Sequence, residues 1–311
     1  MEELLIIATY ENPDLDGVAS AYAYEEFLNK TGQNSKFILF GTYQDEVEFL
    51  INKFSVSLRL NKFDDFKSNK IAIVDASDLR GLSKKINPKK IVEVIDHRKY
   101  YNPGDFPNAT FQVEPVGAAA TLIAEKFDIG NVDISLNSSL LLYYAIVSNT
   151  INFKANVTTE KDIRLSTWLK EKLGKRSNFI SEMFDYKTHN LSVDKQSFLD
   201  SFSSFFKIGG KHIGIVQLEI TNVDNFIESN YEACMSIMRE MKDQFLLDMV
   251  FITHIDLVEG FNKFLAYETE TQNMLSSIFE ISFEKSVAKR NGVIMRKEVV
   301  PLIKAYYGEE V

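Results

Sequence analysis

Leu4-Leu5-Ile6-Ile7-Ala8 is an unbroken apolar run that leads, three residues later, into Asn12-Pro13-Asp14-Leu15-Asp16-Gly17. A run of this kind is typical of a strand buried on both faces of a parallel sheet. Residues 18–30 then follow a helical pattern that ends at Thr31-Gly32. A buried strand, a polar turn and a helix in this order predict the first unit of an α/β fold.

The same alternation continues through the first half of the chain. Apolar segments predict further strands at residues 36–40, 71–74 and 91–95, and helical patterns are found at residues 45–53, 116–127 and 136–149. Strands separated by helices imply right-handed crossovers between neighbouring strands. The first half is therefore predicted to be a doubly layered α/β domain with a mostly parallel sheet.

A second domain is predicted beyond a polar tract, residues 185–190, that carries little periodicity. We place the linker near residues 186–195 and the two domains at residues 1–187 and 193–311. A chain of 311 residues has the length of two domains of roughly 100–200 residues each. The second domain is expected to be a smaller α/β unit, with strands at residues 213–219 and 249–255 and a helix at residues 225–242.

Composition and charge exclude several classes of protein. Hydrophobic residues make up 45% of the chain and charged residues 25%, as in an ordinary globular protein. The longest apolar run near the middle, residues 140–147, is far short of the roughly 20 residues that span a bilayer. The first residues lack the basic segment of a secretory signal, and the one cysteine, Cys234, excludes an internal disulfide. We therefore expect a cytoplasmic protein without a membrane partner.

The net charge of −9 argues against a protein that binds duplex nucleic acid through bulk electrostatics. A small anionic substrate stays compatible with this charge, because a bound metal or a local basic patch can invert the field within one site.

Acidic side chains follow three of the predicted strands. The strand that ends at Ala8 leads to Asp14 and Asp16, residues 71–74 lead to Asp75, and residues 91–95 lead to Asp96-His97. In an open α/β sheet, the carboxyl ends of the strands meet at one edge, where ligands bind. Crowded carboxylates with an imidazole are a suitable ligand set for one or two Mn²⁺ or Mg²⁺ ions.

Each of these residues also has a structural interpretation. An Asp directly after a strand is often the N-cap of a helix or part of a turn. Their recurrence at three successive strand ends favours a metal cluster over three unrelated caps. The spacing alone does not identify the reaction.

The motifs resemble those of the DHH phosphoesterase superfamily, and most closely those of the family II, manganese-dependent inorganic pyrophosphatases. The similarity runs in order along nearly the whole chain. The matching segments are Asn12-Pro13-Asp14-Leu15-Asp16, Val74-Asp75, Asp96-His97, residues 114–121, residues 148–154 with Thr158-Thr159 and Asp162, residues 215–219 and residues 296–301.

The resemblance implies a set of site residues. The metal ligands would be Asp14, Asp16, Asp75, His97 and the residue at position 149, which is Asn149. The substrate would be bound by Arg98, Lys154, Arg296 and Lys297, with the active site in the cleft between the domains. Without the resemblance, Arg296-Lys297 could equally be a solvated pair beside a strand. The family also implies a homodimer formed through the first domain.

The chain departs from the family pattern at four positions. Tyr10 stands where the family has a metal-binding His, Arg98 where it has a phosphate-facing His, and Asn149 where it has an Asp ligand. A substrate-binding Lys falls on Ser204, although Lys207 lies close in the sequence. A neutral phenol is a poor metal ligand, whereas an Asn carbonyl can still bind. We expect one firm metal position, at Asp16, Asp75 and His97 with Asn149 as a candidate fourth ligand, and a weakened one at Asp14 and Asp75.

Two functions follow. The first is a metal-dependent hydrolase of a phosphoanhydride or small phosphoester, such as pyrophosphate, short polyphosphate or a small nucleotide, in which Arg98 binds phosphate. The second is a catalytically impaired homologue that binds a phosphorylated ligand or a partner protein, suggested by Tyr10 and Asn149.

Overall fold

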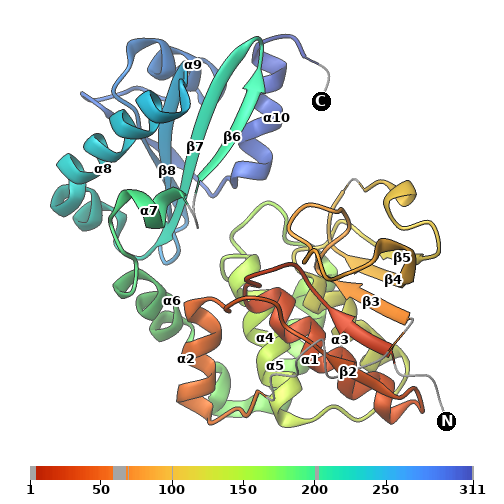
Figure 1. The fold of residues 1–311 in the computed structure, drawn as a ribbon. Helices are drawn as coiled ribbons and strands as arrows, with labels where there is room; N and C mark the ends of the chain where they lie inside the picture. Colours follow the sequence, from red (N-terminus) through yellow and green to blue (C-terminus); the bar gives the residue numbers. More distant parts are fainter. Residues whose placement is uncertain (1–4, 59–67, 69, 100, 200–202, 310–311) are drawn as a thin grey trace. The chain divides into compact units, whose positions relative to one another are not determined.

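The computed structural model describes residues 5–58, 68, 70–99, 101–199 and 203–309 (Figure 1). Leu4, at which the first predicted strand begins, lies outside the described residues. The chain divides into two compact units, Met1–Phe153 with Val157–Tyr186 and Lys154–Asn156 with Lys187–Val311. Each unit contains one five-stranded sheet.

The sheet of the first unit is parallel throughout, in the order β2-β1-β3-β4-β5. Its strands are β1 (Leu5–Ala8), β2 (Ser35–Phe37), β3 (Lys70–Val74), β4 (Ile91–Asp96) and β5 (Thr110–Val113). The three central strands are almost completely buried, as an apolar run in a parallel sheet requires. The predicted parallel α/β sheet is therefore confirmed, and β5 is an additional edge strand.

Helices pack on this sheet and on one another (Figure 1). They are α1 (Leu15–Lys30), α2 (Asp45–Phe54), α3 (Ala119–Ile129), α4 (Leu136–Asn149), α5 (Glu160–Leu173) and α6 (Ile180–His189), with short 3₁₀ turns at Pro88–Lys90, Pro103–Asp105 and Gly174–Ser177. Ser135 caps α4 through its side chain. The middle of this helix, residues 140–147, is apolar and buried on every side. Because α6 continues to His189, the tract expected as an irregular linker is helical in its first part.

The sheet of the second unit is mixed, in the order β10-β9-β8-β7-β6. Only β7 and β8 pair in parallel. The strands are β6 (Ser203–Ile208), β7 (Lys211–Ile220), β8 (Met249–Asp256), β9 (Phe261–Leu265) and β10 (Val287–Asn291), and the helices are α7 (Lys195–Ser197), α8 (Val223–Phe245), α9 (Thr269–Phe279) and α10 (Arg296–Tyr306). The second α/β domain is confirmed.

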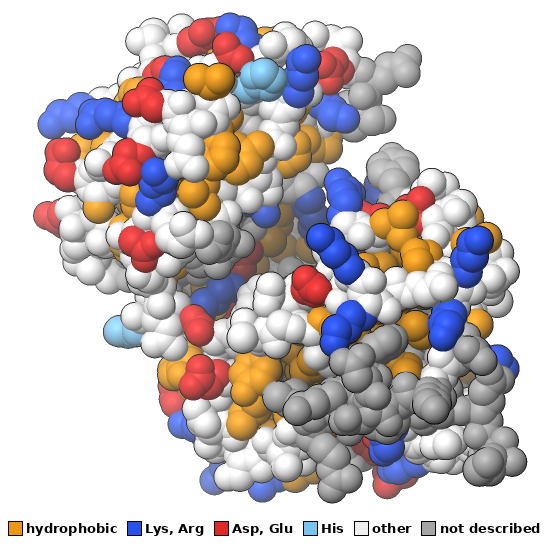
Figure 2. Space-filling model, in the orientation of Figure 1, with side chains coloured by type: hydrophobic (Ala, Val, Ile, Leu, Met, Phe, Trp, Pro, Cys, Tyr) orange, Lys and Arg blue, Asp and Glu red, His pale blue; other side chains and the backbone are white. Residues whose placement is uncertain are grey.

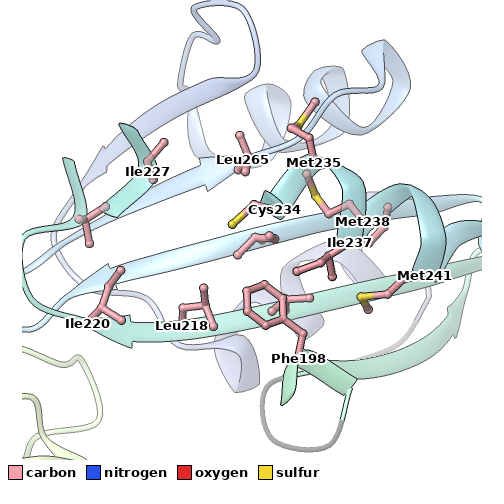
Figure 3. Close-up of a cluster of buried hydrophobic side chains, with 14 of the residues drawn as sticks. Phe198, Leu218, Ile220, Ile227, Cys234, Met235, Ile237, Met238, Met241 and Leu265 are labelled. Atoms are coloured by element: carbon pink, nitrogen blue, oxygen red, sulfur yellow. The ribbon is translucent and has the colours of Figure 1, made fainter. Parts of the chain in front are cut away.

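Both faces of the second sheet are buried. On one face, Leu218 and Ile220 of β7 pack with α8 residues such as Cys234 and Met238 (Figure 3). On the other face, Ile213 and Ile215 pack with residues of α9 and α10. The alternation of β7 thus separates two cores, so odd-numbered residues of this strand share the α10 face.

Arg296 and Lys297 lie in a helix, and the backbone N–H of Arg296 contacts Gln217 of strand β7. They begin α10, where the Met295 backbone N–H donates to the Glu298 carboxylate at 2.9 Å, which is one half of a capping box. Pro301 is the sixth residue of α10 and lies inside the helix, where it has no N–H to donate to the carbonyl of Lys297.

A short segment of the chain outside 187–311 packs within the second unit. The Lys154 ammonium donates to the Val258 carbonyl, and Asn156 Nδ2 donates to Val293 O and Glu298 Oε1, both at 3.2 Å. The residues before it, Ile151, Asn152 and Phe153, have φ of 50°, 50° and 65°. Three successive non-glycine residues in the left-handed region form a sharp reversal after α4.

None of the helices in the described ranges combines the length and the apolar character needed to cross a bilayer. On the face shown in Figure 2, Lys and Arg side chains are scattered among acidic and hydrophobic ones.

Candidate metal centre

Three predicted ligands meet at the carboxyl edge of the first sheet. Asp16 lies in the first turn of α1, Asp75 directly follows β3 and His97 directly follows β4. Each offers one ligand atom, and these atoms lie within 4.8 Å of one another. Asp16 and Asp75 are 1% and 6% exposed, so the group is largely withdrawn from solvent. The fold therefore brings together three residues that follow the ends of parallel strands, Asp75 and His97 directly and Asp16 in the first turn of the next helix.

His97 presents one ring nitrogen to the two carboxylates. Its Nδ1 lies 3.2 Å from the carbonyl oxygen of Val116, which fixes Nδ1 as the donor. Nε2 lies 3.5 Å from Asp75 Oδ1 and 3.8 Å from Asp16 Oδ2. In metal-binding histidines, the ring nitrogen that does not bind the metal usually donates a hydrogen bond that orients the ring, as Nδ1 does here.

Asp16 is held by backbone donors from the start of α3. The N–H groups of Ala119 and Ala120 donate to its two oxygens at 2.8 and 2.7 Å, and Asn149 Nδ2 donates to Oδ2 at 2.7 Å. Burial and the charge of Asp14 nevertheless raise the pKa of Asp16 to about 8. Burial and the charges of Asp16 and Asp14 also raise the pKa of Asp75 well above its usual range. The Arg98 guanidinium acts in the opposite direction on Asp75 but does not cancel these effects.

The surroundings of Asp75 fit a divalent ion. The hydroxyls of Thr9 and Ser77, which are 0% and 1% exposed, have no hydrogen-bond partner within the described residues. Gly17 leaves no room for a side chain, because a Cβ there would lie 2.7 Å from Thr9 Oγ1 and 3.3 Å from Asp75 Oδ2. Buried oxygens without partners beside an Asp-Asp-His group are the environment that a hard cation and its water require.

Asp14 and Tyr10 are beside this group but interact with each other. Asp14 Oδ1 caps α1 by accepting the Gly17 N–H at 3.1 Å, and the Asp14 N–H donates to the Tyr10 hydroxyl at 3.0 Å. Burial and the charges of Asp14 and Asp75 hold the pKa of Tyr10 well above its usual value, so the phenol stays neutral. Asp14 is thus the N-cap of α1, as its structural interpretation predicted.

Arg98 is anchored by two carboxylates. Its Nη1 lies 2.5 Å from Asp78 Oδ2 and its Nε 3.4 Å from Asp96 Oδ2. Asp78 also binds Arg80 at 2.7 Å, and although burial acts in the opposite direction, the hydrogen bond from Arg80 and the charge of Arg98 lower the pKa of Asp78. Asp96 is fully buried and accepts the His97 N–H on its other oxygen at 2.7 Å. Asp78 was not predicted as a site residue, and Asp96 was noted only as the acidic residue before His97, because their pairing with Arg98 depends on where its side chain extends.

The remaining predicted residues belong to the second unit. The backbone N–H of Arg296 donates to Gln217 Oε1 at 2.5 Å, and Gln217 Nε2 donates to Glu219, which pairs with Lys187 at 2.8 Å. Lys297 is exposed at the start of α10, and Lys154 donates to the Val258 carbonyl.

Strand register separates Ser204 from Lys207. Ser204 pairs with Ile215 and therefore lies on the α10 face of the sheet, which also carries Gln217. Lys207 pairs with His212 and lies on the opposite face. Lys207 is therefore not on the sheet face of Arg296, and Ser204 is.

Comparisons with known proteins agree with this fold and group. Residues 4–146 match the DHH family, N-terminal domain. The manganese-dependent inorganic pyrophosphatase of Bacillus subtilis (strain 168) is 26% identical over 310 residues, covering 97% of this chain and 98% of that protein. A solved Methanococcus jannaschii structure, assigned to the family II inorganic pyrophosphatases, has a TM-score of 0.73 at 25% identity, with 97% of this chain and 99% of that chain covered.

An exopolyphosphatase-related protein from Bacteroides fragilis shares the fold, with a TM-score of 0.51, 11% identity and coverage of 98% and 93% of the two chains. Residues 4–146 thus carry a DHH family domain, in a chain that is similar over nearly its whole length to family II manganese-dependent inorganic pyrophosphatases.

Proposed function

We propose that this chain is a divalent-metal-dependent phosphohydrolase that acts on a phosphoanhydride or a small phosphoester. The observation that supports this most directly is the buried Asp16–Asp75–His97 group at the ligand-binding edge of a parallel sheet. The similarity to a manganese-dependent inorganic pyrophosphatase over 97% of the chain supports the same reaction class.

The metal, Mn²⁺ or Mg²⁺, would be held by Asp16, Asp75 and His97, with Asp14 and Asn149 beside them. A bound divalent cation supplies a Lewis acid that neutralises phosphoryl oxygens and makes a water molecule a stronger acid. The chain's own contribution is orientation. The Ala119 and Ala120 amides direct both oxygens of Asp16, and the Val116 carbonyl directs the His97 ring.

Arg98 would bind a phosphoryl oxygen of the substrate. Its guanidinium is planar, permanently charged and held by Asp78 and Asp96, so little side-chain freedom is lost when an anion binds. In the second domain, Arg296, Lys297 and Lys154 are the proposed substrate-binding residues. The Gln217 side chain fixes the backbone of Arg296 at the start of α10.

The test is Mn²⁺-dependent phosphate release from pyrophosphate, tripolyphosphate and a short oligonucleotide, compared side by side. Asp75→Asn removes a charge from the metal group and should lower the rate at least about 100-fold. Asp133→Asn changes an exposed carboxylate of the same domain and should leave the rate unchanged. The substrate with the highest kcat/KM defines the substrate class. Equal rates for the parent chain and Asp75→Asn, or no release from any of the three compounds, would contradict the proposal.

A catalytically impaired homologue is the second candidate, and one contact favours it. Asn149 donates to Asp16 Oδ2 at 2.7 Å, and this oxygen faces the other ligands. If the parent chain is silent and Asn149→Asp releases phosphate from pyrophosphate, the hydrogen bond from Asn149 is the reason for the impairment. Turnover of the parent chain above background, lost in Asp75→Asn, would remove this candidate. The homodimer implied by the resemblance stays a prediction, which the molar mass in solution would test.

A further inference from the structure

A second cation beside the Asp16–Asp75–His97 group would find a poorer set of ligands. Asp14 does not join that group: within the described residues, only these three side chains bring their ligand atoms within 4.8 Å of one another. Asp14 Oδ1 is engaged by the Gly17 N–H, and the Tyr10 oxygen accepts the Asp14 N–H. A second ion would thus rely on two carboxylates and a neutral phenol, with no imidazole of its own.

A fixed positive charge lies next to the same group. The Arg98 guanidinium is held between Asp78 Oδ2, at 2.5 Å, and Asp96 Oδ2, at 3.4 Å. Asp96 is fully buried, and its other oxygen accepts the His97 N–H at 2.7 Å. One carboxylate therefore connects the guanidinium to a ligand of the metal group, and Arg98 compensates charge at the edge of the cluster.

Two differences from the resemblance reduce the negative charge of the cluster. Where the resemblance places a carboxylate and an imidazole, this chain has the neutral Asn149 and the cationic Arg98. Each exchange makes the cluster more positive by one unit, and together they equal the charge of one divalent ion. The Asn149 amide also donates to Asp16 at 2.7 Å. A hydrogen bond thus takes the place of the repulsion that a carboxylate at position 149 would exert on Asp16.

We infer that this centre binds one divalent cation per chain, at Asp16, Asp75 and His97, and that the Arg98 guanidinium supplies the second positive charge. The inference rests on the proposed function only for the presence of a metal. It changes what the site needs from its surroundings, because one of its three units of positive charge is covalently part of the chain and independent of the metal concentration.

The experiment is a Mn²⁺ titration of the full chain, with bound Mn²⁺ counted by metal analysis and its environment observed by electron paramagnetic resonance. We expect one Mn²⁺ per chain, with the spectrum of an isolated ion. Arg98→Ala should tighten Mn²⁺ binding about tenfold, because removal of a nearby positive charge favours a cation. Arg80→Ala is the matched control, since Arg80 also pairs with Asp78 but is 89% exposed, and it should leave Mn²⁺ binding unchanged.

Urea unfolding in EDTA checks that both variants are folded, and the parent stoichiometry tests the inference without any variant. Two Mn²⁺ per chain with dissociation constants within about tenfold of each other, an exchange-coupled spectrum, or no Mn²⁺ binding would overturn the inference. So would unchanged or weaker Mn²⁺ binding in a folded Arg98→Ala. One bound Mn²⁺ per chain together with no phosphate release would support the inference and contradict the proposed hydrolase function.

Discussion

The Asn149 amide donates to Asp16 Oδ2 at 2.7 Å, in a position that the resemblance assigns to a carboxylate. An amide donor stabilises a buried carboxylate, whereas a carboxylate in the same place would repel it. At the scale of single residues, the identity of position 149 therefore sets the balance between the stability of the metal-free chain and its affinity for a cation.

Asn149→Asp should lower the free energy of unfolding in EDTA by about 2 kcal/mol, because a hydrogen bond is replaced by two like charges in a buried site. The same change should raise Mn²⁺ affinity about tenfold, since one more charged oxygen faces the ion. Urea unfolding in EDTA and a Mn²⁺ titration measure the two effects. Asn137→Asp, which adds the same charge at the opposite end of α4, should change neither by much; an equal effect there would contradict the argument.

His254 predicts a pH dependence of the second unit. It is fully buried, its Nε2 has no partner within the described residues, and burial lowers its pKa to about 4. Between about pH 6.5 and pH 4 the unfolded chain binds a proton at this residue and the folded chain does not. The free energy of unfolding should therefore fall as the pH falls through this window, by about 3 kcal/mol for a shift of this size.

The measurement is urea unfolding at pH 7, 6, 5 and 4.5 for the parent chain and His254→Phe, which keeps a ring of similar size without a titratable group. The variant should lose the part of the slope that His254 contributes. His212→Phe alters an exposed histidine of the same domain and should keep the parent slope. Identical slopes for all three proteins would show that folding does not change proton binding by His254 and would contradict the prediction.

At the scale of elements, the sequence predicted those segments whose local pattern decides their structure. The buried strands β1, β3, β4 and β8 consist mainly of apolar residues, and α4 was predicted with the bounds that the structure shows. The edge strands β5, β6 and β10 were not predicted, because their side chains are only partly buried and carry no continuous run. Their pairing is decided by neighbours distant in the sequence.

The same distinction holds for the candidate site. Asp16, Asp75 and His97 were predictable, because each follows a predicted strand and parallel strands end at one edge of a sheet. The hydrogen bond from Asn149 to Asp16, 133 residues away in the chain, depends on how α4 packs against α1. No local pattern contains that information.

Asp162 joins three elements and allows a prediction at this scale. Its fully buried carboxylate accepts hydrogen bonds from the Thr159 N–H and hydroxyl, the Gly117 N–H and the Thr121 hydroxyl, at 2.5 to 2.8 Å. It thus fastens the start of α5 to the turn that directs the amides of α3 toward Asp16. Asp162→Asn should cost about 3 kcal/mol of unfolding free energy, because an amide cannot accept all four donors.

Asp162→Asn should also weaken Mn²⁺ binding several-fold, since the N–H groups that orient Asp16 lose their support. Urea unfolding and a Mn²⁺ titration are the measurements. Asp128→Asn is the control, because Asp128 forms an exposed ion pair with Arg164 and should contribute less than about 0.5 kcal/mol. If Asp162→Asn is destabilised but binds Mn²⁺ as tightly as the parent chain, Asp162 supports the fold only, and its predicted effect on the metal centre is wrong.

At the scale of the whole molecule, the metal group and the second core lie in different compact units. Ligand binding stabilises the part of a protein that holds the ligand. Mn²⁺ should therefore slow amide hydrogen exchange in β1, β3, β4 and the first turns of α1, with little change in α8 and β8. Hydrogen exchange followed by mass spectrometry, with EDTA and then with Mn²⁺, measures this. Equal protection in both units would show that they unfold as one cooperative body.

The path of the chain between the units limits how recombination can exchange the second unit between genes. The chain leaves the first unit after Phe153, returns to it at Val157 and leaves it again after Tyr186. A gene for residues 187–311 alone would specify a second unit whose Val293 carbonyl and Glu298 carboxylate lack the Asn156 amide. Recombination that moves this unit to another protein has to transfer residues 154–156 together with residues 187–311. A single crossover point in the gene cannot do this, although point mutations can still change each unit separately.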